Sequence, residues 1–318
     1  MIIRQKEIFQ YLENEIKLVD PESSSHWNYY HTDFGFKENK FTGLVGFGEN
    51  KKPYEGLFKL IHFLLQYPFR KIGKKYSKFN ELYQLAKKIR RKQNSAFDLD
   101  ILRQVISLSF FYEKLSEKVE FKNNLTCIIG DGFGSLTTLM LESNFSKKII
   151  LINLSKTLLV DLWYIKLCVG DGKFNESVCL INNLDKISED EKKCLFESDK
   201  IKIIAIEAKN HEFIKDFKVD FFINIASMQE MNNSSIRNYF NDIRKSLKKE
   251  NVFFYCCNRL IKRLPDGTIT KFFEYPWKND DELLIDELCP WHRYNYQKYP
   301  PFYKKYDGPV QHRLVRLK

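Results

Sequence analysis

Short apolar runs alternate with helix-like stretches through the middle of the chain. The runs are rich in Ile, Val and Phe, which favours strands. The stretches between them repeat apolar residues every three or four positions, which favours helices. This alternation predicts a parallel α/β sheet. The predicted strands are residues 125–129, 148–153, 201–206, 219–225 and 252–257, and the predicted helices are 135–143, 154–168, 188–198 and 232–248. The type of the short apolar segment 178–182 stays open.

The same pattern divides the chain into three regions. Residues 1–97 form a mostly helical cap that includes a polar aromatic stretch over residues 23–47. Residues 98–259 hold the alternating strands and helices. Residues 260–318 are aromatic and rich in loops, and they end in the strand-like VQHRLVRL. We therefore predict a Rossmann-like, doubly wound, mostly parallel sheet with an N-terminal helical cap and a C-terminal extension that completes the sheet.

A glycine turn follows the first predicted strand and opens a helix. The sequence there is Gly130-Asp131-Gly132-Phe133-Gly134. Glycines allow a tight turn and a close approach of a ligand to the backbone, and the following helix offers free N–H groups. The turn therefore predicts a site for a nucleotide-like cofactor.

The spacing around the turn argues against two common nucleotide sites. A dinucleotide fingerprint needs a third glycine where Ser135 stands, and an acidic residue where the second strand ends in Asn153. A P-loop is excluded because no Gly-Lys-Ser or Gly-Lys-Thr follows. A nicotinamide-dependent oxidoreductase is therefore disfavoured.

The GxGxG turn after an apolar strand resembles motif I of class I S-adenosylmethionine-dependent methyltransferases. The segments INLSKTLLVDLWYIK, NIASMQEM, DELCPWHRY and PPFYKKYDGPVQHRL extend this resemblance to the sugar O-methyltransferases of bacterial surface-polysaccharide clusters. The family usually carries Asp or Glu at the position of Asn153, so either Asn153 or the nearby Asp161 is expected to meet the ribose. The resemblance implies the following S-adenosylmethionine-binding residues: Gly130, Asp131, Gly132, Gly134, Asn153, Glu207, Ala208 and Asn224.

Methyl transfer to a hydroxyl group benefits from a general base. Glu230 follows the fourth strand, and His292 lies in the CPWH sequence, so both are candidate bases. His26, His31, Asp286 and Trp291 are candidate acceptor contacts, and the C-terminal extension is expected to complete the acceptor site. Glu230, Asp286, Glu287 and His292 could also hold a metal, but their spacing is not diagnostic, and no metal is predicted.

These residues predict an O-methyltransferase that acts on a sugar hydroxyl of a nucleotide-linked, lipid-linked or polymeric surface glycan. Two alternatives remain open: a methyltransferase for another small-molecule or phosphoryl-type acceptor, and a non-catalytic cofactor-binding scaffold. The NPPY motif of enzymes that methylate nucleic-acid amino groups is absent, since NIASMQEM stands at that position. No nucleic-acid partner is therefore expected.

Composition adds expectations about binding partners, cysteine oxidation state and cellular location. The net charge is +11, and much of it lies between Arg70 and Lys92. Such a run is either a solvated helix face or a surface for an anionic membrane or lipid-linked substrate. The seven cysteines have no CxxC spacing, so reduced, buried thiols are expected rather than disulfides or a zinc site. With no signal-peptide core, a cytoplasmic location is the expectation.

Overall fold

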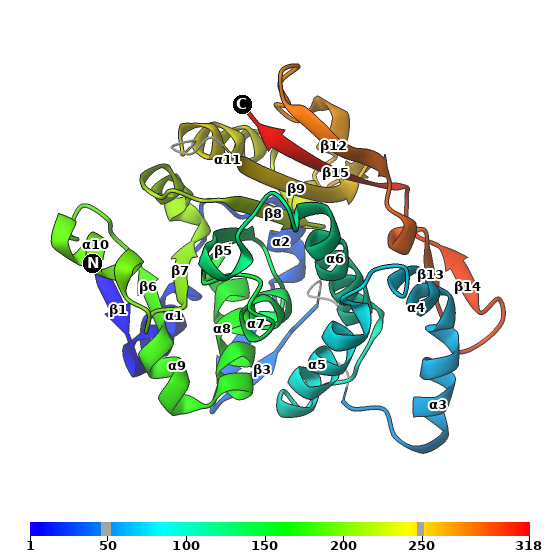
Figure 1. Cartoon of the computed structure of the whole chain (residues 1–318). Helices are drawn as coiled ribbons and strands as arrows, with labels where there is room; N and C mark the ends of the chain where they lie inside the picture. Colours follow the sequence, from blue (N-terminus) through cyan, green and yellow to red (C-terminus); the bar gives the residue numbers. More distant parts are fainter. Residues whose placement is uncertain (46–51, 247–250) are drawn as a thin grey trace.

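A computed structural model describes residues 1–45, 52–246 and 251–318 (Figure 1). Its centre is a nine-stranded sheet in the order β1-β6-β7-β5-β4-β8-β9-β15-β12. The strands from β6 to β9 pair in parallel, whereas β1, β12 and β15 pair antiparallel to their neighbours. This arrangement confirms the predicted doubly wound, mostly parallel sheet. Its strands are β1 (Ile2–Arg4), β4 (Leu125–Ile129), β5 (Lys148–Asn153), β6 (Val178–Ile181), β7 (Ile203–Glu207), β8 (Phe221–Ile225), β9 (Val252–Arg259), β12 (Glu282–Leu288) and β15 (Val310–Leu317).

Helices cover both faces of this sheet. Side chains alternate between the faces along each buried strand, as the two-residue period of a strand requires. In β5, for example, Ile149 and Leu151 enter one apolar cluster, and Ile150 and Ile152 enter the other. The longer helices are α1 (Lys6–Glu15), α3 (Gly56–Leu65), α5 (Phe79–Lys92), α6 (Leu99–Leu115), α7 (Ser135–Glu142), α8 (Ser155–Val169), α10 (Glu189–Glu197) and α11 (Asn233–Lys245). The shorter ones are α2 (Ser25–Tyr30), α4 (Tyr67–Gly73) and α9 (Asp171–Ser177).

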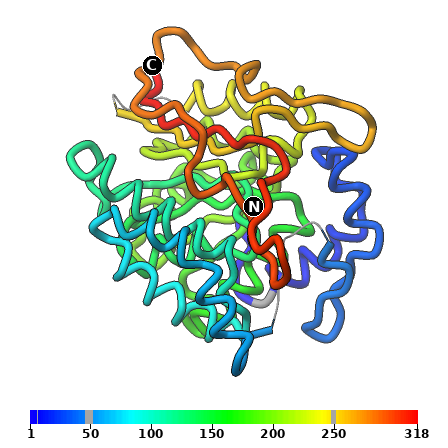
Figure 2. Tube along the Cα trace, turned by 90° about the vertical axis from the view of Figure 1, so that its right-hand side faces the viewer, coloured from blue at the N-terminus to red at the C-terminus, as the bar shows by residue number. Residues whose placement is uncertain are grey.

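In the described ranges, three small hairpins lie outside the main sheet. They are β2 (Gly35–Lys37) with β3 (Lys40–Thr42), β10 (Ile261–Arg263) with β11 (Ile269–Lys271), and β13 (Tyr294–Tyr296) with β14 (Tyr303–Lys305). Figure 2 shows the orange and red C-terminal segment at the front, with the dark-blue N-terminal segment and the light-blue and cyan helices on opposite sides of it. Both ends of the chain therefore pack onto the central domain.

Most predicted elements agree with the structure to within two residues. The segment 178–182, whose type was open, contains strand β6. The predicted helix 232–248 corresponds to α11, and residues 247 and 248 lie outside the described part of the chain, as do residues 46 and 47 of the aromatic stretch. Within the described residues, no helix is both long enough and apolar enough to cross a bilayer.

Strand order puts the switch point of the sheet at β4. The chain leaves β4 toward β5 and β7 on one side and later returns to pair β8 on the other side. Ligands of open α/β sheets bind at such a switch point, beyond the carboxyl ends of the strands. The glycine turn at residues 130–134 lies at this end of β4.

Candidate functional site

The glycine turn has the backbone conformation that its sequence predicts. Gly130, Gly132 and Gly134 all have positive φ, at 77°, 72° and 55°. A Cβ atom at Gly130 would lie 2.3 Å from Oγ of Ser227, whereas one at Gly132 would meet no atom within 4 Å. Glycine is thus required at 130 for packing against the chain that follows β8, while Gly132 leaves space beside the backbone.

A cleft of about 300 Å³ opens at this edge of the sheet. It gathers residues from the ends of β4, β5, β7 and β8, and from the C-terminal extension. Five of the predicted cofactor-binding residues line it, together with both candidate bases: Gly130, Asp131, Gly132, Asn153, Ala208, Glu230 and His292. Residues that are far apart in the sequence therefore meet in one cavity at the switch point.

The end of strand β5 is tied to the glycine turn through Asp161. The buried Asp161 carboxylate accepts hydrogen bonds from Gly134 N–H at 2.9 Å and from Nδ2 of Asn153 at 2.8 Å. Burial, and then the nearby Asp131, raise the pKa of Asp161 well above its usual range. The amide oxygen of Asn153 already accepts bonds from Leu154 N–H and the Thr157 hydroxyl. Asn153 can therefore offer a ligand the second hydrogen of its amide nitrogen.

Asp131 has a local structural role within the cleft. Its two carboxylate oxygens accept hydrogen bonds from Leu136 N–H at 3.0 Å and Thr137 N–H at 2.7 Å. These are orphan donors of the first turn of α7, so Asp131 caps this helix. Burial raises the pKa of Asp131.

Three predicted cofactor-binding residues lie behind the cleft wall instead of lining it. Gly134 packs on α8, where a Cβ atom would lie 2.6 Å from the Asp161 carbonyl oxygen. Glu207 is fully buried and accepts hydrogen bonds from Tyr11 at 2.6 Å and Ser155 at 2.7 Å. Asn224 is also fully buried, and its Nδ2 donates to the Ile129 carbonyl at 2.7 Å. These three residues stabilise the ends of the strands by packing and hydrogen bonds.

Among the described residues, Glu230 is one of five acidic residues that line the cleft, with Glu22, Asp98, Asp100 and Asp131. It ends the short 3-10 helix η3 (Met228–Glu230), directly after β8, and its side chain is 17% exposed. Burial raises its pKa to about 7, against the opposing fields of Lys262 and Arg259. A carboxyl group with this pKa can accept a proton near neutral pH. Ala226, between β8 and η3, has a positive φ of 60°, which is unusual for a residue with a side chain.

The N-terminal cap brings His26 to Glu230. Nε2 of His26 lies 3.5 Å from Oε2 of Glu230, and the Ser24 hydroxyl donates to the Glu230 carbonyl oxygen at 2.5 Å. Burial lowers the pKa of His26 to about 4, and Lys262 and Arg259 act in the same direction. A neutral imidazole therefore faces the carboxyl group. Trp27, the next residue on α2, lines the cleft.

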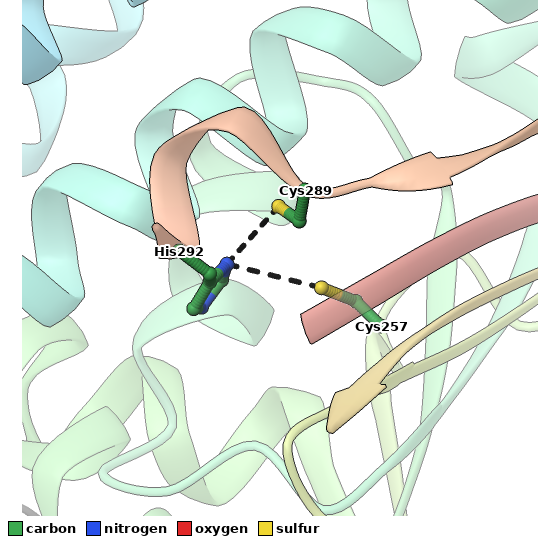
Figure 3. A group of neighbouring side chains, drawn as sticks. All are labelled: Cys257, Cys289 and His292. Atoms are coloured by element: carbon green, nitrogen blue, oxygen red, sulfur yellow. Dashed lines mark hydrogen bonds between the residues drawn. The ribbon is translucent and has the colours of Figure 1, made fainter. Parts of the chain in front are cut away.

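His292 also lines the cleft, and it contacts two thiols. Its Nδ1 lies 3.1 Å from Sγ of Cys289 and 3.8 Å from Sγ of Cys257 (Figure 3). All three residues are buried. Burial opposes ionisation of Cys257, but hydrogen bonding with Cys289 and the field of His292 lower the pKa of its thiol well below the usual range. Burial raises the pKa of Cys289.

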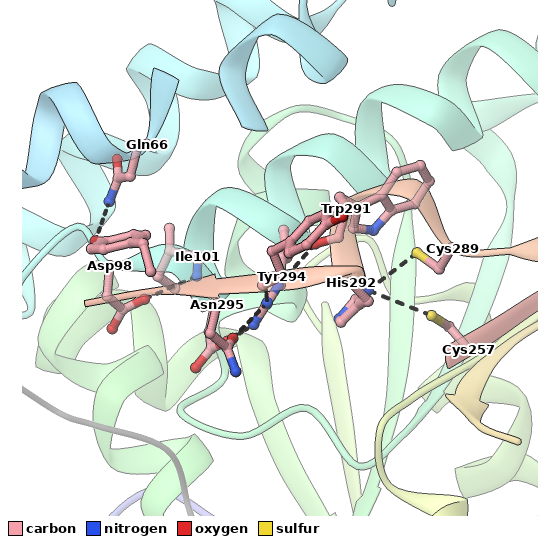
Figure 4. Close-up of polar contacts among 12 residues, drawn as sticks. Gln66, Asp98, Ile101, Cys257, Cys289, Trp291, His292, Tyr294 and Asn295 are labelled. Atoms are coloured by element: carbon pink, nitrogen blue, oxygen red, sulfur yellow. Dashed lines mark hydrogen bonds and ion pairs between the residues drawn. The ribbon is translucent and has the colours of Figure 1, made fainter. Parts of the chain in front are cut away.

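None of the four predicted acceptor contacts is among the cleft-lining residues. His26 lies beside Glu230, and the other three have structural contacts elsewhere. Trp291 is fully buried, and its indole nitrogen donates to the Ser107 hydroxyl at 3.1 Å. Figure 4 shows it pointing away from the side chain of His292. Asp286 on β12 pairs with Arg313 at 2.7 Å. His31 is buried beside Trp27, with ring centroids 4.7 Å apart. Core packing and cross-strand pairing account for these three residues.

Arg259 and Tyr306 are among the cleft residues that the sequence pattern did not predict. Arg259, at the end of β9, lies over the Tyr306 ring at 5.2 Å, and both residues line the cleft. Nη2 of Arg259 pairs with the exposed Asp307 at 3.2 Å. Its buried Nε has no hydrogen-bond partner among the described residues. A basic residue directly after a predicted strand was the available signal.

Comparisons with known proteins give weak similarities of fold. No protein-family model matches the chain, and no curated protein matches it. Among solved structures, the pyocyanin biosynthetic protein PhzM matches at 8% identity and a TM-score of 0.37, over 68% of this chain and 57% of that one. TrmK of M. capricolum, in complex with S-adenosylhomocysteine, matches at 10% identity and a TM-score of 0.36, over 65% and 67%. The methyltransferase CalO6 matches at 9% identity and a TM-score of 0.37, over 63% and 60%. Such values assign neither a family nor an activity to this chain.

Proposed function

We propose that this protein is an S-adenosylmethionine-dependent O-methyltransferase. The observation that carries the proposal is the position of the glycine turn and Glu230 in one cleft, at the switch point of the sheet. The proposed acceptor is a sugar hydroxyl on a nucleotide-linked, lipid-linked or polymeric glycan. This choice rests on the sequence resemblance and on the polar, cationic side of the cleft.

The residues at the strand ends fit S-adenosylmethionine. Gly132 leaves open space beside the backbone, so the turn can approach the methionine and ribose portions closely. Asn153 retains an amide hydrogen for a ribose hydroxyl group. Ala208, at the end of β7, offers a small apolar side chain for the adenine. Ala226 and Ser227, after β8, face the same cleft.

When bound, S-adenosylmethionine supplies a methyl group on a positively charged sulfur that leaves as a neutral thioether. The acceptor hydroxyl group must lose its proton as its oxygen bonds to the methyl carbon. Glu230 is the proposed base, because its carboxylate lines the cleft and has a pKa of about 7. The proton passes from the acceptor oxygen to a carboxylate oxygen of Glu230, and the products are a methyl ether and S-adenosylhomocysteine.

His26 and His292 have different proposed roles. His26 lies beside the carboxyl group of Glu230, with Nε2 3.5 Å from Oε2 and without a hydrogen bond among the described residues, and is proposed as a positioning residue. Nδ1 of His292 is occupied by the two thiols. That leaves only the other ring nitrogen of His292 for the acceptor. Glu230 is therefore favoured over His292 as the base.

The acceptor side of the cleft combines aromatic and cationic groups. Trp27 and Tyr306 offer flat faces on which a sugar ring can stack. Arg259 has a buried donor available within the described structure. Lys262 adds a second positive charge near Glu230, and burial followed by repulsion from Arg259 lowers the pKa of this lysine. A phosphate group of a nucleotide- or lipid-linked sugar would relieve this repulsion.

Cofactor binding and turnover test the proposal separately. Isothermal titration with S-adenosylhomocysteine should detect binding by the wild-type protein and none by Gly132→Val. Failure of the wild type to bind, or undiminished binding by a folded Gly132→Val protein, would refute the cofactor assignment. Transfer of a labelled methyl group to a panel of sugar nucleotides tests the acceptor class. Binding without transfer to any glycan, small-molecule or phosphoryl acceptor would favour the scaffold alternative.

A further inference from the structure

Two buried thiols and an imidazole form a compact cluster beside the cleft. Sγ of Cys257, Sγ of Cys289 and one ring nitrogen of His292 all lie within 4.8 Å of one another. Cys257 comes from β9, Cys289 precedes the short 3-10 helix η5 (Pro290–His292), and His292 ends it. The Cys-x-x-His spacing brings the last two ligand atoms together on one turn. This Cys-x-x-His spacing differs from the CxxC spacing of paired cysteine ligands.

We propose that Cys257, Cys289 and His292 bind Zn²⁺. In a tetrahedral site with Zn–S bonds of about 2.3 Å and Zn–N bonds of about 2.0 Å, neighbouring ligand atoms lie roughly 3.5 to 3.8 Å apart. The separations of 3.1 Å and 3.8 Å between Nδ1 of His292 and the two Sγ atoms need only small shifts to reach these values. Two thiolates and a neutral imidazole would also cancel the charge of the ion, as a buried site requires. This proposal departs from the sequence expectation of no metal.

The metal would fix the chemistry of His292. An imidazole that binds zinc through Nδ1 keeps its hydrogen on Nε2, so that nitrogen can donate a hydrogen bond but cannot accept a proton. His292 would then orient the acceptor as a donor, and Glu230 would remain the base. Three protein ligands also leave the fourth position of a tetrahedral zinc for water or another ligand.

Metal analysis of the purified protein tests the site without an activity assay. Protein prepared with a reductant and without chelators should contain about one equivalent of zinc, and Cys257→Ser or Cys289→Ser should lose it. Cys256→Ser is the matched control, because Cys256 is the buried neighbour on the same strand. Since the variants could unfold, cobalt reconstitution of the wild type provides a second readout, with an expected thiolate-to-cobalt charge-transfer band. No bound zinc, no such band, or a Cys257–Cys289 disulfide would each overturn the proposal.

Helix α3 presents an exposed apolar surface. The outward side chains of this helix are large and apolar, and they are about half exposed or more: Leu57, Phe58, Leu60, Phe63 and Leu64. Its buried residues are His62 and Leu65. Tyr67 on α4 and Tyr299, Phe302 and Tyr303 of the β13–β14 hairpin are also exposed. We call these nine exposed residues the apolar patch.

Specific contacts join the hairpin to α3. Nδ1 of His62 lies 2.9 Å from the Tyr296 hydroxyl, and the Tyr303 hydroxyl donates to the Leu65 carbonyl at 3.0 Å. Nζ of Lys298 lies 4.5 Å from the centroid of the Phe58 ring. Figure 1 draws α3 at the edge of the molecule, beside α4 and this hairpin. The patch is thus one continuous surface built from two distant parts of the sequence.

The two segments that carry the apolar patch are rich in lysine. Segments 52–75 and 294–306 contain eight exposed lysines and one acidic residue, Glu55, in a chain whose net charge is +11. A second copy on a two-fold axis would bring these lysines against each other. An anionic bilayer instead attracts the lysines and takes up the apolar side chains at its interface.

We infer that the apolar patch docks the protein onto an anionic membrane surface. The mode is peripheral: α3 would lie in the plane of the headgroups, with its apolar side chains inserted and the lysines on the lipid phosphates. The inference is independent of the proposed methyl transfer, because α3 forms no part of the cleft lining.

Vesicle sedimentation tests the membrane surface. The protein should bind vesicles of phosphatidylcholine with phosphatidylglycerol far better than phosphatidylcholine alone, and salt should weaken the binding. Phe58→Ser with Leu64→Ser should weaken it about tenfold or more, and so should Lys74→Glu with Lys75→Glu. Leu18→Ser and Lys193→Glu, exposed elsewhere, are the controls.

All of these variants should keep wild-type affinity for S-adenosylhomocysteine. The membrane inference can therefore be refuted without refuting the proposed cofactor binding, and the reverse. Absence of vesicle binding would overturn the inference, as would a stable dimer that the patch substitutions dissociate.

Discussion

The carboxylate of Asp161 accepts a hydrogen bond from the side-chain amide of Asn153 at 2.8 Å. The same carboxylate accepts the Gly134 N–H at 2.9 Å. Asp161 therefore connects the end of β5 to the glycine turn after β4, and it does so from behind the cleft. The family that the sequence resembles usually has an acidic residue at position 153, where this chain has Asn153; the structure shows that its amide is held by an acid eight residues later.

Asp161→Ala should weaken both the fold and cofactor binding. It leaves the Gly134 N–H and the Asn153 amide buried without their acceptor, which costs about 1–3 kcal/mol for each group. Asp161→Asn retains one acceptor oxygen and should have a smaller effect. Thermal unfolding and titration with S-adenosylhomocysteine measure the two consequences. Equal, wild-type-like affinity in both variants would show that the turn does not depend on this connection.

Gly130→Ala and Gly132→Ala should separate folding from binding. The new Cβ at position 130 would lie 2.3 Å from Oγ of Ser227, so this variant should lose stability. The new Cβ at 132 meets open space, although its positive φ adds strain of about 1 kcal/mol. Gly132→Ala should therefore remain folded and lose affinity for S-adenosylhomocysteine. The idea fails if Gly132→Ala binds normally while folded.

The sequence was sufficient where burial dictates the pattern. Strands β4 and β5 agree with predicted ranges 125–129 and 148–153 because strands buried on both faces are continuous apolar runs. Strand β12 was missed because it is an edge strand with many exposed and acidic residues. Strand β1 was missed because it has three residues and exists through its pairing with β6.

Part of the candidate site was also predictable from local sequence patterns. The position of Glu230 after a parallel strand was enough to bring it to the edge with the glycine turn. Its contact with His26 was not predictable, because it joins residues 26 and 230 through packing of the cap. The contact of Cys257 with Cys289 and His292 likewise depends on β15 pairing between β9 and β12. Local patterns carry no information about such distant pairings.

Glu230→Gln should become more stable relative to the wild type as the pH rises. Folding raises the pKa of Glu230 from 4.5 to about 7, so the folded state binds this proton more tightly than the unfolded state does. The stability that this group contributes to the wild type is fully present below the unfolded pKa. It is lost, by about 3 kcal/mol in all, as the pH rises through the folded pKa. Glutamine cannot ionise and avoids this loss. The difference in melting temperature between variant and wild type should therefore widen from about pH 5 to about pH 8.

The buried His26 makes the stability of the protein depend on pH in the opposite direction to Glu230. Its pKa is lowered to about 4, so its contribution is lost as the pH falls below the usual pKa of histidine. Because His26 is present in both proteins, comparing Glu230→Gln with wild type largely removes this term. A difference in melting temperature that is independent of pH would contradict the raised pKa of Glu230.

The same substitution tests Glu230 as the base. Methyl transfer by the wild type should increase with pH through about 7, as the carboxylate forms. Glu230→Gln should lower kcat about 10²- to 10⁴-fold and remove this pH dependence. Its affinity for S-adenosylhomocysteine should change little. A variant that keeps the wild-type rate and pH profile would exclude Glu230 as the base.

Arg259→Gln should discriminate between charged and neutral acceptors. The guanidinium lies in the cleft with its Nε buried, and the described structure gives this nitrogen no hydrogen-bond partner. A phosphate on the acceptor would supply one, in a charged hydrogen bond of about 1.5–3 kcal/mol. The KM for a sugar nucleotide should therefore rise about tenfold or more, while the KM for a neutral glycan stays constant. Arg259→Lys, which keeps the charge, should recover part of the loss, and Lys193→Gln should behave as wild type. If Arg259→Gln raised both KM values equally, Arg259 would shape the cleft without recognising a phosphate.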